Sequence, residues 1–322
     1  MQEKLLAAVD LGGTKILTII ADLNGKILVR KLLPTPPQTD AAGLLHVLES
    51  AITQTLAAIN KSIIHLAAVG LCVPGFFDIK ERVVLKLPNI PLVKNFPLES
   101  ALAQRLGVPV LVENDANAAA VGEARQGAAK GHRDLIYITV STGIGAGLIL
   151  NGELYRGSRG FAGEFGHLEV KSEGPLCGCG KRGCLEAVAS GTAIARRANE
   201  ALRKNGETKL SQWAVQNNGK VTAEHVFLAA KAKDPTAIAI IEEAVFYLGI
   251  SISNLINLLN PSLVVLGGGV TNAGDVFFAP LQKIVAKNTV KYANQDVKIV
   301  PAALGSEAGA IGMLFLVKNQ LK

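Results

Sequence analysis

Short apolar runs separated by turn residues open the chain and predict β-strands. Residues 5–10 form a continuous apolar run that ends in Asp10, and two further runs follow at 16–21 and 26–33. Runs of this length bounded by glycines are typical of strands, and the Asn24-Gly25 pair is typical of a hairpin turn. The pattern therefore predicts three antiparallel strands at the start of the chain.

The next hundred residues alternate between helical and extended patterns. Apolar residues at helical spacing in 41–60 predict an amphipathic helix, and 98–106 has a similar, shorter pattern. Residues 67–73 and 108–112 are apolar runs that predict further strands, and the alanine-rich stretch 116–129 predicts a helix. This alternation is typical of an α/β protein.

The opening pattern then occurs a second time. A strand predicted at 135–140 leads into a glycine turn at 141–147, and a hairpin around Asn151-Gly152 joins 148–150 to 153–155. The order strand, glycine turn, strand, Asn-Gly turn, strand thus repeats. A duplicated unit predicts two similar α/β domains that face a central cleft.

The rest of the chain bears on the domain boundaries. Residues 185–259 have a mostly helical pattern, and the apolar segment 305–318 predicts a helix that packs back on the body. We expect a smaller N-terminal domain made of residues 1–115 with 304–322, and a larger domain of residues 116–303.

Composition sets limits on the class of protein. The chain has 322 residues, of which 49% are hydrophobic, which is enough for two domains with proper cores. The N-terminus lacks a signal-peptide layout and no apolar run approaches the ~20 residues of a membrane span, so we expect a cytoplasmic protein without membrane association. The net charge is +7, with scattered Lys and Arg. This favours an anionic small ligand over nucleic acid.

Three of the four cysteines lie close together and predict a metal site. Cys177, Cys179 and Cys184 follow His167 within one glycine-rich loop, residues 163–186. Three thiolates and one imidazole complete the tetrahedron that structural Zn²⁺ requires. Buried free cysteines or a disulfide are the alternatives, but this spacing without a signal peptide favours zinc.

Two carboxylates bracket the metal ligands. Glu164 precedes His167, and Glu186 follows the last cysteine. Carboxylates fixed beside a metal-bound loop are good acceptors for hydroxyl groups, which indicates a sugar as the ligand. A zinc-ligating imidazole also has a second nitrogen free to bond a neighbour, so His167 would contact both zinc and substrate.

Two glycine turns follow strands and are candidate phosphate sites. They contain Gly12-Gly13-Thr14 and residues 142–145, and a run of backbone N–H groups there would bind an anion. Neither turn has the Walker A pattern. A dinucleotide fold would need a helix after the second turn, but the Asn151-Gly152 hairpin signal contradicts one.

Acidic residues at strand ends complete the candidate chemistry. Asp10 ends a strand just before the first glycine turn and would hold Mg²⁺, directly or through water, against nucleotide phosphates. Asp115 follows another strand and would accept a hydroxyl proton. Asn114 beside it would bond a neighbouring hydroxyl, although its type is also typical of a helix cap. Lys15 is either a phosphate neighbour or a solvated residue.

These motifs together resemble the ROK family of sugar kinases. The segments Asp10–Lys15, 113–120, 140–167 and 177–186 are similar to the first phosphate motif, the catalytic stretch, the signature and the zinc motif of the family. Residues 266–270 resemble the loop on the adenosine side. The resemblance runs from end to end and is most specific in the zinc motif. It is closest to the bacterial ATP-dependent glucokinases.

The resemblance implies a duplicated two-domain fold of the actin, hexokinase and Hsp70 type, with ATP and Mg²⁺ as co-substrates and structural Zn²⁺. It implies that Asp115 is the general base. Sugar contacts would come from Gly75, Asn89, Asn114, Asp115, Glu164, His167 and Glu186. The nucleotide would contact Asp10, Gly12, Gly13, Thr14, Lys15, Thr142, Gly143, Gly267, Gly268 and Gly269. A homodimer or homotetramer is implied by the resemblance alone.

The predicted reaction is ATP- and Mg²⁺-dependent phosphorylation of an aldohexose at the 6-hydroxyl, with glucose as the first choice. N-acetylmannosamine, N-acetylglucosamine and fructose are alternative substrates. A sugar-sensing regulator is the non-enzymatic alternative. The family includes repressors with an N-terminal DNA-binding domain. Because the phosphate motif already begins at Asp10, we expect no such domain here.

Overall fold

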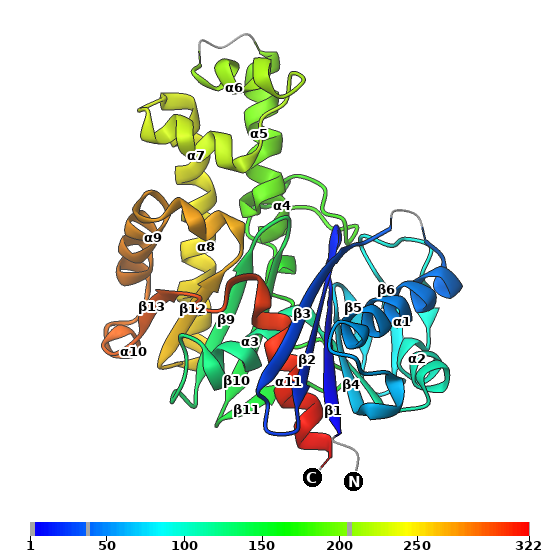
Figure 1. Ribbon diagram of the computed structural model, residues 1–322. Helices are drawn as coiled ribbons and strands as arrows, with labels where there is room; N and C mark the ends of the chain where they lie inside the picture. Colours follow the sequence, from blue (N-terminus) through cyan, green and yellow to red (C-terminus); the bar gives the residue numbers. More distant parts are fainter. Residues whose placement is uncertain (1–3, 37–38, 205–207, 322) are drawn as a thin grey trace. The chain divides into compact units, whose positions relative to one another are not determined.

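The computed structural model describes residues 4–36, 39–204 and 208–321 (Figure 1). The chain forms two compact units. The first comprises Met1–Arg133, Gly147–Gly163 and Ala303–Lys322, and the second comprises Asp134–Ala146 and Glu164–Ala302. Both units contain strands and helices. The domain limits at 115 and 303 stay a prediction.

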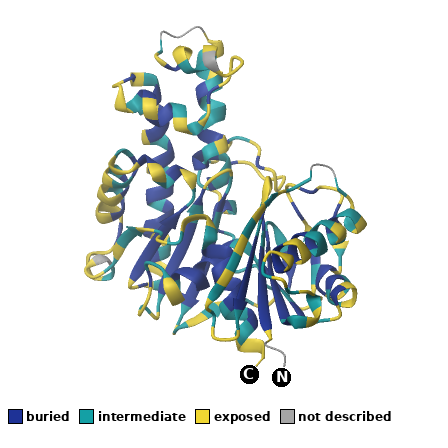
Figure 2. Ribbon diagram, viewed as in Figure 1, coloured by how far each residue is buried: buried dark blue, intermediate teal, exposed yellow. Residues whose placement is uncertain are grey.

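The sheet of the first unit begins with the three predicted antiparallel strands. The strand order is β3-β2-β1-β4-β8, and β1, β4 and β8 are parallel. The strands are β1 (Leu5–Leu11), β2 (Lys15–Asp22), β3 (Ile27–Pro34), β4 (Leu66–Val73) and β8 (Val110–Asn114). Nearly every residue of β1 is buried, whereas β3 alternates between half-buried and exposed positions as an edge strand (Figure 2).

Alternate residues of β1 face two different layers of helices. Leu5, Ala7 and Val9 share a core with Leu44 of α1 and Leu102 of α2. The residues between them, such as Leu6 and Ala8, pack on the other face against α11. The helices of this unit are α1 (Ala41–Ala57), α2 (Leu98–Leu106), α3 (Asp115–Gln126) and α11 (Ala308–Gln320), with short 3₁₀ turns η1 (Ile63–His65) and η4 (Gly305–Glu307).

Helix α11 is the C-terminal helix predicted to pack back on the body, and the structure confirms that packing. It lies against β1 and β4 and against α3. A Cβ atom on Gly122 would lie 2.3 Å from the Ala308 carbonyl oxygen, and one on Gly312 would lie 1.7 Å from that of Ala118. Two glycines therefore allow α3 and α11 to approach more closely than other residues would.

The second five-stranded sheet repeats the topology of the first. Its order is β11-β10-β9-β12-β13, with β12 parallel to β9 and β13, and with β10 antiparallel to β11. The strands are β9 (Leu135–Val140), β10 (Ile144–Leu150), β11 (Glu153–Tyr155), β12 (Leu263–Gly267) and β13 (Lys298–Pro301). The predicted duplicated α/β fold is thus confirmed.

Helices make up most of the remaining second unit. They are α4 (Leu185–Ala189), α5 (Gly191–Arg203), α6 (Leu210–Gln216), α7 (Ala223–Lys231), α8 (Pro235–Leu259), α9 (Asp275–Asn288) and α10 (Lys291–Asn294), with 3₁₀ turns η2 (Phe165–His167) and η3 (Gly269–Ala273). The mostly helical character predicted for 185–259 is confirmed.

Helix α8 bears on the expectation about membrane spans. It has 25 residues and is long and apolar enough to cross a membrane, by length and composition only. However, 56% of an apolar 18-residue stretch of this helix is buried within the protein, and α8 packs against α7 and α9. Its apolar length therefore fits the core helix of the second unit. It is the single such helix among the described residues.

One sequence prediction differs from the structure, and one small sheet was missed. The glycine turn predicted at 141–147 is shorter, because β10 already begins at Ile144. A small sheet of β5 (Phe76–Asp78), β6 (Val83–Lys86) and β7 (Lys94–Phe96) was not predicted. Its strands have only three or four residues, which is too short for a periodic pattern to appear.

Candidate active site

Asp10 and the first glycine turn lie at the carboxyl end of β1. The Gly12 N–H donates to the Lys15 carbonyl over 2.9 Å and closes the turn. A Cβ on Gly13 would lie 2.4 Å from the side-chain nitrogen of Asn89, so a predicted sugar residue lies directly against the phosphate turn. The side chain of Lys15 is exposed at the start of β2. The turn thus combines predicted phosphate and sugar residues in one place.

The Asp10 carboxyl is half-buried and has an unusual environment. Burial raises the pKa of Asp10 to about 6, and a hydrogen bond with the Cys72 thiol lowers it in part. Cys72 pairs with Asp10 across β1 and β4. Burial, then the charges of Asp10 and Asp115, raise the pKa of the Cys72 thiol well above its usual value. The thiol therefore stays protonated and donates to the carboxylate.

Asp115 begins helix α3, and Asn114 caps that helix. The Asn114 side-chain oxygen accepts from the N–H groups of Ala116 and Asn117 over 2.9 and 3.1 Å. The cap interpretation of Asn114 is therefore correct. Its side-chain nitrogen donates to the Gly75 carbonyl over 3.2 Å, so two predicted sugar residues are joined. Asp115 itself lies in the first turn of α3, at the positive end of the helix dipole.

Glu113, the residue before Asn114, forms an ion pair with Arg156 that the sequence did not reveal. Arg156 Nε lies 2.6 Å from Glu113 Oε2, and the glutamate side chain is only 2% exposed. Asn117 donates to the other carboxylate oxygen over 3.0 Å. The sequence gives no indication that Glu113 forms an ion pair, because its partner Arg156 lies 43 residues away along the chain.

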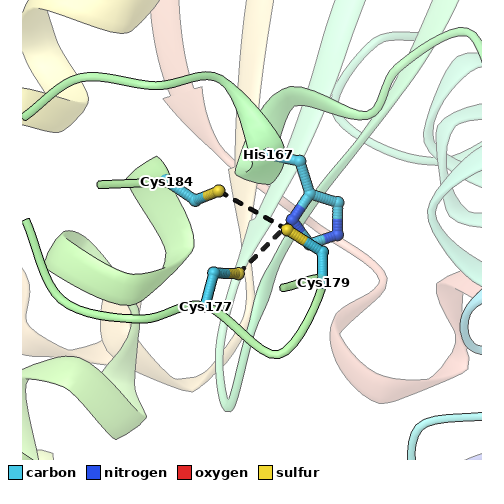
Figure 3. Close-up of side chains that lie close together, drawn as sticks. All are labelled: His167, Cys177, Cys179 and Cys184. Atoms are coloured by element: carbon cyan, nitrogen blue, oxygen red, sulfur yellow. Dashed lines mark hydrogen bonds between the residues drawn. The ribbon is translucent and has the colours of Figure 1, made fainter. Parts of the chain in front are cut away.

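The four predicted zinc ligands converge in the second unit. Their candidate ligand atoms all lie within 4.8 Å of one another (Figure 3). Cys179 Sγ lies 3.6 Å from Cys184 Sγ, and Cys177 Sγ lies 3.6 Å from His167 Nδ1. Tetrahedral zinc with bonds of about 2.3 Å places its sulfur ligands roughly 3.8 Å apart. All four cysteines of the chain are free, so the cluster fits zinc and the disulfide alternative has no support.

Burial affects the charge of the thiols in this cluster. It raises the pKa of the Cys184 thiol to about 12, and the neighbouring cysteines add to this. Deprotonating several crowded sulfurs needs a compensating positive charge, which zinc supplies when bound. With Nδ1 of His167 facing Cys177, its Nε2 lies 3.8 Å from Glu164 Oε2. The second nitrogen thus faces a predicted sugar residue.

Glu164 and Glu186 lie near each other but have different partners. Burial, and then the charge of Glu186, raise the pKa of Glu164 to about 7. Glu186 accepts a hydrogen bond over 2.9 Å from the N–H of Ile144, at the end of the second glycine turn. The structure therefore connects one bracketing carboxylate to the predicted phosphate turn.

A pocket of about 690 Å³ opens beside the second glycine turn. Among the residues predicted to contact the nucleotide, Thr142 and Gly269 line this pocket, whereas Gly267 and Gly268 do not. A Cβ on Gly268 would lie 2.4 Å from the Val140 carbonyl, so that glycine permits close backbone packing. The pocket is lined by Ser141, Thr142, Gly191, Thr192, Ala195, Val221, Thr222, Ala223, Glu224, Phe227, Leu228, Lys231, Gly269, Val270, Asn272 and Ala273. Its volume suits a nucleotide-sized ligand.

Known proteins share both the sequence and the fold. The sequence matches the ROK family over residues 6–320. It is 37% identical over 321 residues to a glucokinase from Halalkalibacterium halodurans, covering 99% of this chain and 97% of that protein. It is 33% identical to a xylose repressor from Bacillus subtilis, covering 96% of this chain and 76% of the repressor.

A solved structure agrees with these similarities. The crystal structure of a ROK family glucokinase from Streptomyces griseus, in complex with glucose and AMPPNP, superposes with a TM-score of 0.82. The two chains are 36% identical, and the match covers 97% of this chain and 98% of the other. Fold and similarity define the class: the protein is a sugar kinase with an actin/hexokinase-like fold. Within that class, the chain belongs to the ROK family.

Proposed function

We propose that the enzyme transfers the γ-phosphoryl group of ATP to the 6-hydroxyl of glucose, in the presence of Mg²⁺. The observation that carries this proposal is the full-length similarity to glucokinases together with Asp115 at the first turn of α3. The Streptomyces griseus relative was crystallised with glucose and an ATP analogue, which supports the same pair of ligands here.

Asp115 is the proposed general base. Its carboxylate takes the proton of the sugar hydroxyl while that oxygen forms a bond to the γ-phosphorus. The bond from that phosphorus to the bridging oxygen breaks, and ADP leaves. Such transition states are loose, so orientation and charge stabilisation contribute most to the rate. Helix α3 fixes Asp115 in a defined position, because Asn114 caps the helix directly before it.

The remaining predicted contacts have supporting roles in this proposal. The sugar hydroxyls would be held by Gly75, Asn89, Asn114, Glu164, His167 and Glu186. The nucleotide would be held by Asp10, Gly12, Gly13, Thr14, Lys15, Thr142, Gly143, Gly267, Gly268 and Gly269. Asp10 is the carboxylate available for Mg²⁺, which would neutralise phosphate charge when bound. His167 and the three clustered cysteines would hold structural zinc.

The sugar and the class of activity each have an alternative. N-acetylmannosamine, N-acetylglucosamine and fructose are the alternative sugars, and a hydroxyl of each would accept the phosphoryl group in the same way. The similarity to a xylose repressor supports a second function, a sugar-sensing regulator. The presence of Asp10 and Asp115 favours the kinase, since a protein that only binds sugar needs no base.

A coupled assay of ADP release across a panel of hexoses and N-acetylhexosamines tests the proposal. We expect the highest kcat/KM with glucose and no release without sugar. A higher kcat/KM with another sugar would replace glucose as the substrate. Sugar binding without any ADP release would support the regulator instead.

We also propose a cytoplasmic homodimer or homotetramer, with no nucleic acid or membrane partner. Light scattering after size-exclusion chromatography gives the oligomer directly. A monomeric mass at the working concentration would contradict that part of the proposal.

A further inference from the structure

Both ends of the zinc loop contact the second glycine turn. At one end, a Cβ on Gly166 would lie 2.1 Å from the Ile144 carbonyl oxygen, so η2 packs directly on the turn. Just beyond the other end, Gly191 at the start of α5 donates its N–H to the Ser141 carbonyl over 2.8 Å. The loop that carries the metal ligands therefore also supports the backbone of residues 141–144.

Glu186 makes the central contact of this arrangement. Its Oε2 accepts from the Ile144 N–H over 2.9 Å. A Cβ on Gly143 would lie only 2.3 Å from the same oxygen, so the carboxylate packs tightly on the turn. The other carboxylate oxygen lies 3.9 Å from Cys177 Sγ. One side chain thus connects the metal-ligand cluster with the glycine turn.

The turn is also a wall of the 690 Å³ pocket. Ser141 and Thr142 line that pocket, and so do Gly191 and Thr192 at the start of α5. Glu186 lies in the short helix α4, only a few positions before these α5 residues. A shift of Glu186 would therefore move two parts of the pocket wall at once.

We infer that Glu186 is a positioning residue for the nucleotide, and that it sets nucleotide affinity even when no sugar is bound. This inference rests on the proposed function, because it takes the pocket as the nucleotide site. A carboxylate near phosphates is unfavourable by charge alone. Its contribution here is the hydrogen bond that fixes the Ile144 N–H and the shape of the turn.

Calorimetric titration of the purified, zinc-loaded protein with Mg-ADP in the absence of sugar tests the inference. Glu186→Ala should weaken ADP binding on the order of tenfold, the effect of losing one charge-assisted hydrogen bond. Glu186→Gln keeps an oxygen acceptor and should bind ADP within about twofold of the wild type. A purely electrostatic effect would instead make both variants bind ADP more tightly.

Glu164→Ala is the matched control. Glu164 is the other bracketing carboxylate, and its described ion pair is with His167. We expect this variant to lose sugar affinity and to retain ADP affinity. Equal losses of ADP affinity in Glu164→Ala and Glu186→Ala would overturn the inference, because general loosening of the loop would explain both.

Two further outcomes separate this inference from the proposed function. Unchanged ADP affinity in Glu186→Ala, with the wild type active on sugar, would overturn the positioning role alone. A wild-type protein that does not bind Mg-ADP would overturn both. Zinc content is measured in each variant. If Glu186→Ala loses metal, Glu186→Gln decides the question, because tenfold weaker ADP binding by this variant with its zinc retained would overturn the inference.

Discussion

Arg156 Nε lies 2.6 Å from Oε2 of Glu113. Glu113 directly precedes Asn114, the cap of helix α3. The carboxylate is 2% exposed and the arginine 31%. Replacing Arg156 with Met would leave a buried charge without its cation. We expect a loss of about 3–5 kcal/mol in the free energy of unfolding. Urea unfolding of the ligand-free protein measures this loss.

A surface pair provides the control for that prediction. Arg30 Nε lies 2.9 Å from Glu307 Oε1, with side chains 47% and 35% exposed. Arg30→Met should cost less than about 1 kcal/mol, because exposed ion pairs contribute little. The double variant Glu113→Gln with Arg156→Met should regain part of the lost stability. Equal effects of Arg156→Met and Arg30→Met would contradict the proposed importance of burial.

Asp115→Asn tests the proposed base. The amide has nearly the same shape but cannot accept the hydroxyl proton, so turnover should fall about 10²–10⁴-fold. Asparagine is also compatible with the first turn of a helix, so stability should change little. Turnover is measured by ADP release, and binding of sugar and ADP is measured separately. Near-normal turnover would remove Asp115 from the role of base.

Asp10 predicts a particular dependence of stability on pH. Its pKa is about 6 in the folded protein, against the ordinary value of 3.8, because of burial. Between these values the folded protein retains a proton that the unfolded chain has released. The free energy of unfolding should therefore fall as pH rises from about 4 to about 6, by up to about 3 kcal/mol from this group.

Comparison with Asp10→Asn isolates that contribution. Asp78, Asp234 and Glu243 have lowered pKa values, because hydrogen bonds outweigh their burial. They contribute an opposite slope at lower pH, but both proteins share them. Urea unfolding across this range should show that the variant gains stability relative to wild type as pH rises through 6. Parallel curves for the two proteins would show that Asp10 titrates normally.

Local patterns predicted much of the fold, and the differences have tertiary causes. The strand predicted at 108–112 is β8, Val110–Asn114. Charged Glu113 has the character of a loop residue in the sequence, but Arg156 from a distant hairpin neutralises it within the strand. Likewise, Gly147 has the character of a turn residue. It lies in β10 instead, and it is a glycine because a Cβ there would lie 2.6 Å from both the Ala116 carbonyl oxygen and the Ala120 side chain.

The site was predictable to the extent that its residues are close in sequence. The four predicted zinc ligands span residues 167–184, so their spacing alone indicated that they converge. The pocket was largely missed, because residues such as Phe227 and Lys231 line it from helix α7. A helical pattern shows which face is apolar but does not show which distant turn that face will meet. The contact of Glu186 with Ile144 was missed for the same reason.

The last prediction concerns the metal. Purified, unchelated protein should contain one zinc per chain, and Cys179→Ser or strong chelation should remove it. Structural zinc contributes up to ~10–16 kcal/mol in small peptides, and we expect a smaller loss here because each unit has its own core. Cys72→Ser is the control, since Cys72 lies in β4 outside the cluster and its variant should keep its zinc. Metal analysis that finds no zinc in the wild-type protein would contradict the assignment. Equal zinc content in Cys179→Ser and Cys72→Ser would show that the ion binds without the full set of ligands.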